Sequence, residues 1–181
     1  MKEAKIRQIE PSEYRLLEDF FYHAIFVPPG VATPARDIIY DPKLFIYVDG
    51  FGGEGDCGVV ADLGGRIGGG DDCGVAADLG GIAGGSASPQ VIGAAWARII
   101  PAYGYIDDET PELAISVLPD YRGQGVGTGL LTHLFGLLRE RGCRQTSLSV
   151  HKLNAAARLY LRMGYEVFRE NDEDYIMVKV L

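Results

Sequence analysis

The chain has 181 residues, 47% of them hydrophobic, which is enough for one domain with a substantial core. Its formal net charge of −8 argues against a general nucleic-acid binder, which would need a basic face. No run approaches the roughly 18 apolar residues of a membrane span, and the opening M-K-E-A-K-I-R-Q-I has no apolar signal region.

The three cysteines are Cys57, Cys73 and Cys143. Their spacing matches no metal-ligand pattern, and an odd number leaves one over in any disulfide scheme. They therefore predict reduced thiols in a cytoplasmic protein, without a metal site.

Basic residues gather between positions 122 and 162 of this acidic chain. Glu140 is the only acid in that interval, against Arg122, Arg139, Arg141, Arg144, Lys152, Arg158 and Arg162. A local basic excess suits a polyanionic ligand, although a solvated helix face explains such residues equally well.

The first predicted element is a short strand over residues 4–9, after which Pro11 and Ser12 open a helix with Ser12 as its cap. Apolar residues recur at helical spacing in this helix and indicate a stripe that faces the core. The stripe consists of Leu16, Leu17, Phe20, Phe21 and Ala24. Prolines at 28, 29 and 34 then interrupt the chain with a loop.

A second helix is predicted after Asp41, a good N-cap, and Pro42, which suits a first helical turn. The apolar residues at 44, 45 and 48 belong to it, and it ends near Gly50. The run L-F-I-Y-V at 44–48 also fits a strand, so the two alternatives stay open here.

Residues 52–89 contain a direct duplication. Residues 56–65 read D-C-G-V-V-A-D-L-G-G and residues 72–81 read D-C-G-V-A-A-D-L-G-G, so the pattern returns after sixteen residues with only Val60 against Ala76 changed. Each copy is typical of a strand followed by a tight Gly-Gly turn. Calcium-binding glycine–aspartate repeats do not fit, because they need tandem nonapeptides.

Residues 91–100 predict the strand that pairs with one of the two copies. A linker rich in acids and aromatic residues follows. Leu113, Ile115 and Val117 then alternate with smaller residues, which predicts a strand with one buried face.

The most informative stretch is 117–128, V-L-P-D-Y-R-G-Q-G-V-G-T, which leads from that strand into a helix. The helix is indicated by apolar residues at helical spacing, and it ends at Gly142. A glycine-rich turn of this kind presents consecutive backbone N–H groups at the positive end of a helix dipole, which suits a pyrophosphate. Glycine also lets the anion approach the backbone and adopts positive φ without steric cost.

The remaining elements are short. Residues 145–150 predict a strand, and residues 154–163 a helix that Gly164 closes at the position after its C-cap. Residues 165–181 predict a final hairpin around a turn at 171–174.

Two common phosphate-binding motifs do not match the turn. The dinucleotide fingerprint lacks its acidic residue, and a Walker loop would need Gly-Lys-Ser/Thr. Arg122, Gly125 and Gly127 instead form R-x-x-G-x-G, which resembles the acetyl-CoA signature of the GCN5-related N-acetyltransferases, the GNAT family. Residues 154–165, N-A-A-A-R-L-Y-L-R-M-G-Y, resemble that family's next motif at the expected separation.

This resemblance implies an α/β protein with the GNAT fold, formed by residues 1–181 as a single domain. A central twisted sheet of mixed antiparallel and parallel strands, about six to seven of them, is flanked by helices. One strand–turn–strand hairpin occupies the place of the duplication in that fold, so one copy is surplus. Residues 52–89 are therefore expected to form an enlarged glycine-rich insertion with a long loop.

The resemblance also implies how acetyl-CoA binds as a cosubstrate. The central strand and the strand at 145–150 run parallel and splay apart, and the pantetheine arm lies between them. The residues expected to contact acetyl-CoA are Ile115, Ser116, Val117, Arg122, Gly123, Gln124, Gly125, Val126, Gly127, Thr128 and Asn154. Asn154 lies one residue closer to Tyr160 than in the commonest family spacing, where Leu153 stands, and it is also a good helix N-cap.

The implied reaction is direct transfer of the acetyl group to an amine within a ternary complex. Glu112 is the first candidate for the base, with Asp107, Asp108 and Glu109 behind it, and Ser149 stands where some members carry a Glu. Tyr160 is the expected general acid that protonates the departing CoA thiolate. The structural alternatives are a solvated loop charge for each acid and a packed aromatic ring for Tyr160.

The expected acceptor is an amine of a small molecule or a peptide, cationic because of the four carboxylates at 107–109 and 112. Nucleic acid and membrane are not expected partners, and a homodimer is left open. The alternative function is a non-catalytic GNAT-fold module that binds acetyl-CoA as a sensor or scaffold.

Overall fold

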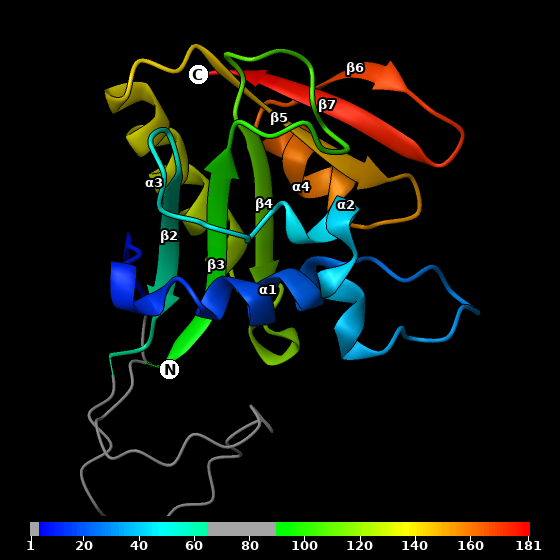
Figure 1. Cartoon of the computed structure of the whole chain (residues 1–181), viewed down its shortest axis with the longest axis horizontal. Helices are drawn as coiled ribbons and strands as arrows, with labels where there is room; N and C mark the ends of the chain where they lie inside the picture. Colours follow the sequence, from blue (N-terminus) through cyan, green and yellow to red (C-terminus); the bar gives the residue numbers. More distant parts are fainter. Residues whose placement is uncertain (1–3, 65–89) are drawn as a thin grey trace, which may run out of the picture.

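The computed structural model describes residues 4–64 and 90–181, which form one mixed sheet with helices on both faces (Figure 1). The described strands lie in the order β1-β2-β3-β4-β5-β7-β6. Their bounds are β1 Lys5–Gln8, β2 Cys57–Asp62, β3 Val91–Arg98, β4 Glu112–Val117, β5 Gln145–His151, β6 Glu166–Glu170 and β7 Asp174–Val180. The α-helices are α1 Leu16–Ala24, α2 Pro42–Phe45, α3 Val126–Glu140 and α4 Ala157–Arg162. This is the architecture predicted from the sequence.

The sheet changes character at β4, its central strand. On one side β4 pairs with β3 in antiparallel register along its whole length. On the other side it runs parallel to β5, and Glu112↔Ser147 is the one register pair that joins these two strands. The two strands therefore part beyond Glu112, as predicted, and leave a wedge at the carboxyl end of β4.

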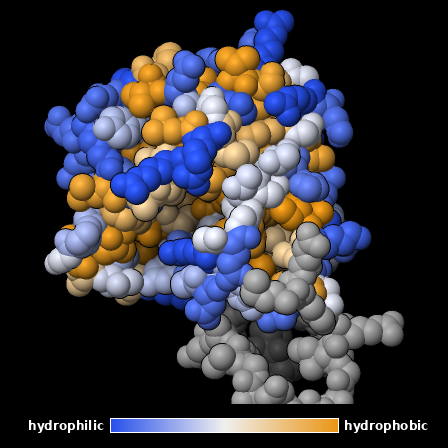
Figure 2. Space-filling view, turned by 180° about the vertical axis from the view of Figure 1, so that it is seen from behind, coloured by the Kyte–Doolittle hydropathy of each residue, from blue (hydrophilic) through white to orange (hydrophobic). Residues whose placement is uncertain are grey.

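Two hydrophobic clusters cover the two faces of the sheet, and the alternation of side chains along the strands separates them. Val59 and Ala61 of β2 pack on the α3 side, together with fully buried leucines of α3. Val60 and Trp96 pack on the α1 side. Figure 1 shows α1 crossing in front of the sheet and α3 behind it. Figure 2, the view from behind, shows apolar and polar side chains interspersed over that face.

The predicted Ser12 cap is wrong, because the first helical turn is a 3-10 helix, Pro11–Glu13, and α1 begins only at Leu16. Glu10 is the cap residue, and it forms a reciprocal capping box with Glu13. Glu13 is also held by Arg7, whose guanidinium donates to both of its carboxylate oxygens at 2.7 Å. This ion pair lowers the pKa of Glu13. It also holds the 3-10 helix against β1, the strand that contains Arg7.

The prediction of a helix after Asp41 is confirmed, and the strand alternative for 44–48 is wrong. The Asp41 carboxylate accepts from the Lys43 amide at 2.9 Å, and Pro42 occupies the first turn. The chain then continues through turns to Gly50, whose φ of 59° lies in the left-handed region. The helix predicted at 154–163 is shorter than expected, since α4 begins at Ala157 after a hydrogen-bonded turn.

The first copy of the duplication supplies β2, which pairs with both β1 and β3. Asp56, just before the strand, fixes its start, because its carboxylate accepts from Gly52 and Gly53 and pairs with Arg98 at 3.0 Å. The second copy, at 72–81, and the expected long loop lie outside the described residues.

We expect deletion of residues 56–71 to leave a folded protein, because the second copy then follows Gly55 directly with nearly the same sequence. Loop closure depends only weakly on length, so the cost should come from placing Ala76 where Val60 stands. Val60 is fully buried, and the loss of its two methyl groups should lower the free energy of unfolding by roughly 2 kcal/mol.

Urea denaturation of the deletion variant measures this loss. Val60→Ala in the full-length chain is the matched control and should lose about as much, while Ala76→Val in the deletion variant should restore stability. An insoluble or unfolded deletion product would show that both copies are needed.

Candidate active site

A cleft of about 1010 Å³ lies at the carboxyl end of β4. Its floor is the end of β4, one side is the turn into α3, and the other sides are the segment after α1 and the start of α4. The sequence-predicted residues that line it are Ile115, Ser116, Val117, Arg122, Gly123, Gly125, Gly127, Thr128 and Asn154. Residues far apart in the sequence thus meet around one opening.

The turn into α3 has the backbone geometry that its glycines predict. Gly123 and Gly125 have φ values of 73° and 85°, and a side chain at either position would be strained. A Cβ at Gly127 would lie 3.3 Å from Leu159, so this glycine allows α3 to approach α4 closely. The first backbone N–H groups of a helix have no intrahelical acceptor, and at α3 they lie at the edge of the cleft.

Arg122 fixes this turn to the central strand, because its Nε donates to the Val117 carbonyl at 2.7 Å. Its guanidinium also makes this end of the cleft positive. His23 lines the same cleft, and its pKa is lowered by burial and then by the charge of Arg122. An anionic ligand therefore meets a favourable potential here.

Two residues of the predicted set do not line the cleft. Gln124 donates through Nε2 to the Asp120 carbonyl at 2.8 Å, which closes the turn. Val126 packs against the core beneath α3. Both residues support the shape of the turn without contributing to the lining of the cleft.

A second, smaller cavity of about 260 Å³ adjoins the cleft, and we call it the acceptor cavity. The two share Ala24, Ile25, Phe26, Ile115, Asn154 and Tyr160 as lining residues. A molecule that fills the cleft therefore reaches the acceptor cavity past Tyr160.

Tyr160, on α4, stands at this junction. Its side chain is 8% exposed, and its ring packs edge-on against Tyr165 with 5.8 Å between centroids. Burial raises its pKa to about 12, so the hydroxyl keeps its proton at neutral pH. No hydrogen bond of this hydroxyl is found within residues 4–64 and 90–181, so the ring is packed while the hydroxyl is free to bond to a ligand.

Glu112 begins β4 and lies on the wall of the acceptor cavity, only 2% exposed. Its Oε1 accepts from the Tyr47 hydroxyl and, at 2.7 Å, from the Gly104 amide. Its Oε2 is buried and has no partner among the described residues. Burial raises the pKa of Glu112 to about 7, although the bonds from Tyr47 and Gly104 oppose the rise. A carboxyl of this kind can take up a proton near neutral pH.

Tyr47 and Gly104 hold this carboxyl, and sequence reasoning missed both. Tyr47 follows α2 and stacks on Phe21, with 5.0 Å between ring centroids. Its carbonyl accepts from the Trp96 indole at 3.0 Å, so both ends of the residue are fixed. A Cβ at Gly104 would lie 2.8 Å from the Glu112 carboxyl carbon, so only glycine permits this approach. The sequence feature that could have indicated this contact is a glycine, Gly104, between two tyrosines.

Asn154 holds the turn that precedes α4, and the expectation that it is the helix N-cap is wrong, because the N-cap of α4 is Ala156. Its Oδ1 accepts from the Ala156 amide at 2.9 Å, and its carbonyl accepts from the Ala157 amide at 3.0 Å. The residue also lines both cavities. Its contact with a ligand stays a prediction.

The acids at 107–109 lie in an exposed turn and line neither cavity. Asp107 accepts from the Glu109 amide at 3.0 Å, and Asp108 accepts from the Tyr105 hydroxyl at 2.8 Å. They stabilise the turn itself, which agrees with the structural alternative that these acids are solvated loop charges. The second carboxylate of the acceptor cavity is Asp174 on β7, which the sequence did not single out.

The acetyltransferase (GNAT) family profile matches residues 72–165, slightly more than half of the chain. The match begins at the second copy of the duplication, whereas the first copy forms β2. The [ribosomal protein bS18]-alanine N-acetyltransferase of Escherichia coli K12 is 44% identical over 59 residues, which are 32% of this chain and 40% of that protein. The match thus spans less than half of the relative's length.

Solved structures agree in fold. The PaiA N-acetyltransferase of Thermoplasma acidophilum in complex with coenzyme A has a TM-score of 0.59 at 15% identity, over 98% of this chain and 99% of that chain. The GNAT domain of S. lividans PAT has a TM-score of 0.60 at 20% identity, over 98% and 90%. No helix in the described ranges is long and apolar enough to cross a membrane. The family profile and the shared fold agree, and the chain belongs to the acetyltransferase (GNAT) family.

Proposed function

We propose that the protein transfers the acetyl group of acetyl-CoA to an amine, in the cytoplasm. The observation that carries this proposal is the pair of side chains on the acceptor cavity. Glu112 offers a buried carboxyl whose pKa is about 7, and Tyr160 offers a protonated hydroxyl where that cavity meets the cleft. A base and an acid that line the same cavity suit an acyl transfer.

The cleft fits acetyl-CoA in chemistry as well as in size. The N–H groups of the turn at 123–128 would hold the pyrophosphate, with the charge of Arg122 beside them. The edge of β4 that faces β5 pairs only at Glu112 among the described residues, so Ile115 to Val117 would offer backbone groups to the amides of the pantetheine arm. Acetyl-CoA supplies the activated acyl group as a thioester.

The reaction requires three proton transfers. A primary amine is mostly protonated at neutral pH and must lose one proton before it attacks. Glu112 would take that proton, and the neutral nitrogen then forms its bond to the carbonyl carbon. The tetrahedral intermediate breaks its carbon–sulfur bond, Tyr160 would give its proton to the departing sulfur, and the second proton of the nitrogen would restore the Tyr160 hydroxyl. The products are an amide and CoA, and holding both reactants in adjoining cavities supplies much of the rate.

The nature of the relatives suggests one acceptor class. The matched E. coli protein is named for an alanine of a ribosomal protein. A peptide amine is therefore a reasonable acceptor to test beside small amines, although the match covers less than half of that protein.

The test is the release of CoA from acetyl-CoA in the presence of single amines and short peptides, followed by mass spectrometry of the acceptor. An acetylated acceptor supports the enzyme. Tight binding of acetyl-CoA without turnover of any acceptor would favour the non-catalytic sensor or scaffold instead.

We expect Gly125→Trp to weaken acetyl-CoA binding at least about tenfold, because φ at Gly125 is positive and an indole there would occupy the anion site. Isothermal titration with CoA measures the effect. Gly136→Ala, on the same helix with open space around it, is the matched control and should bind normally. Unchanged affinity in folded Gly125→Trp would remove the turn from the proposed site.

A further inference from the structure

The acceptor cavity has an unusual charge balance. Its lining contains two carboxyl groups, Glu112 and Asp174, and no lysine or arginine among the described residues. The other titratable groups that face it are Tyr47, Tyr103, His151 and Tyr160. Nδ1 of His151 accepts a hydrogen bond from the Leu153 amide at 3.1 Å. The cavity thus combines two carboxyl groups with hydroxyl and imidazole groups, and its described lining has no lysine or arginine to balance the two carboxyl groups.

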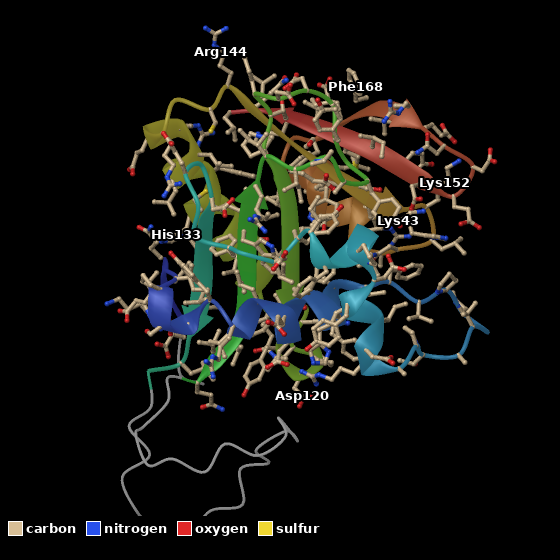
Figure 3. The ribbon with its side chains drawn as sticks, viewed as in Figure 1. Lys43, Asp120, His133, Arg144, Lys152 and Phe168 are labelled. Carbon is tan, nitrogen blue, oxygen red and sulfur yellow. The ribbon has the colours of Figure 1, made fainter. Side chains whose placement is uncertain are left out.

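The nearest lysines along the chain do not change this balance. Lys152 follows His151, but its Nζ lies 2.7 Å from Glu170 and over the ring of Tyr175. Lys43 precedes the lining residue Leu44 and is exposed. Figure 3 shows both lysines on the right-hand side of the molecule, Lys43 on α2 and Lys152 just after β5. Neither belongs to the lining of the cavity.

One side of the cavity is apolar and aromatic. Phe21 stacks on Tyr47, and Phe26 packs against His151 with 5.0 Å between ring centroids. Ile25 and Leu44 complete this side. An apolar cavity of about 150 Å³ is large enough for benzene, so the 260 Å³ here admits a compact apolar or aromatic group.

The position of Glu112 sets how a carboxylate on the acceptor would behave. The amine must reach the unpartnered Oε2, so a carboxylate on the neighbouring carbon would lie within about 5 Å of Glu112. Two like charges at that distance in a desolvated site repel strongly. The acceptor carboxylate would also have to leave water for a site where no cation pairs with it, which costs free energy.

We propose that the acceptor is a primary amine on an uncharged, apolar stem, and that amines with a carboxylate on the same carbon, as in free α-amino acids, are rejected. The inference rests on the proposed function for the reaction and for the placement of the amine beside Glu112. The charge of the cavity lining then supplies the selectivity. An amine whose neighbouring carboxylate is masked as an amide, as at the start of a peptide, meets the same requirement.

Three acceptors with the same phenethyl stem test this selectivity: phenethylamine, L-phenylalaninamide and L-phenylalanine. We expect kcat/KM for each of the first two to exceed that for phenylalanine by at least about 100-fold at low salt. Phenethylamine is the stricter comparison, because its amine is mostly protonated at neutral pH, as that of phenylalanine is. Turnover of phenylalanine within about tenfold of phenethylamine would overturn the inference.

Calorimetry of the same three amines, with CoA bound, separates this inference from the proposed function. Binding of phenethylamine without binding of phenylalanine supports the selectivity even if nothing is acetylated. Equal binding of the two contradicts it whether or not the protein is an enzyme.

Asp174 provides the matched variants. Asp174→Lys places a cation on the cavity wall and should reduce the preference for phenethylamine over phenylalanine at least about tenfold. Asp174→Asn removes one negative charge without adding a cation and should reduce it less. An unchanged preference in folded Asp174→Lys would show that charge in this cavity does not select the acceptor.

Discussion

Glu112→Gln is expected to lower kcat by about 10²–10⁴-fold, the usual contribution of general acid–base catalysis. Glutamine keeps the size of the side chain, and its Oε1 can still accept from Tyr47 and Gly104, so the site should keep its shape. Only the ability to take a proton is lost. The affinity for acetyl-CoA should change little, since Glu112 does not line the cleft. A parent rate in Glu112→Gln would remove this residue as the base.

The pH dependence of the parent enzyme follows from the same group. Because the base acts when it is deprotonated, kcat/KM should rise with pH and level off above the Glu112 pKa of about 7. The bond from Tyr47 stabilises the charged carboxylate. Tyr47→Phe should therefore move the rise to higher pH and recover most of the activity there.

Tyr105→Phe is the control for this shift, because it removes a nearby hydroxyl that is bonded to Asp108 and lines neither cavity. Its pH profile should match that of the parent. A uniform loss of activity at every pH in Tyr47→Phe would mean that Tyr47 only supports the fold.

The raised pKa of Glu112 also makes the free energy of unfolding depend on pH. Between about pH 4.5 and pH 7 the folded protein holds a proton that the unfolded chain has lost, so stability is full below this window and falls as pH rises through it. The loss amounts to about 3 kcal/mol by pH 8. Glu112→Gln should remove this part of the pH dependence, which denaturant unfolding at pH 5 and pH 8 can measure.

Tyr160→Phe is expected to reduce kcat by about 10²–10⁴-fold while acetyl-CoA affinity stays nearly constant. The variant keeps the ring that packs on Tyr165 and removes only the hydroxyl, which has no bond within the described part of the chain. Stopped-flow or steady-state assays with the best acceptor measure the loss. The effect should be largest for acceptors whose transfer is limited by departure of the thiolate.

Tyr165→Phe is the matched control, since it removes a buried hydroxyl from the neighbouring ring without touching either cavity. It should turn over close to the parent rate. Equal rates for Tyr160→Phe and the parent would assign Tyr160 to packing alone, the structural alternative that its ring contacts already satisfy.

Much of the fold follows from local patterns. The alternation at 113–117, the helical spacing before Gly142 and the glycines of the turn each depend on the short-range geometry of strand, helix and left-handed backbone. The glycine-rich turn therefore has the predicted conformation, with positive φ at Gly123 and Gly125. Most residues expected around the cleft lie there because this turn and the end of β4 are contiguous in sequence.

The acceptor side could not be assembled in that way. Tyr47, Gly104, His151 and Asp174 come from four segments, and only the packing of α1, β4 and the final hairpin brings them together. The acids at 107–109 misled the prediction because they are close to Glu112 in sequence. Their turn uses its own hydrogen bonds and points them toward solvent, which no local pattern reveals.

The duplication shows a further limit of sequence reasoning. The two copies differ only at Val60 and Ala76, so their patterns predict the same strand, and propensity favours the first copy at that one position only. The structure pairs the first copy with β3, and Asp56 forms an ion pair with Arg98. The rest of the two strands is identical, so the local pattern there gives no basis for choosing between them.

The single register pair between β4 and β5 has a consequence for the lifetime of the protein in the cell. With only Glu112↔Ser147 joining the two strands, the half of the sheet from β1 to β4 and the half from β5 to β7 share little backbone bonding at their seam. If the proposed function is right, acetyl-CoA binds between the two halves of the sheet and connects them. Any ligand that binds only the folded state stabilises that state by mass action. Turnover by proteases would then follow the metabolic supply of acetyl-CoA, because a chain without its cosubstrate opens at the seam more often than a loaded one.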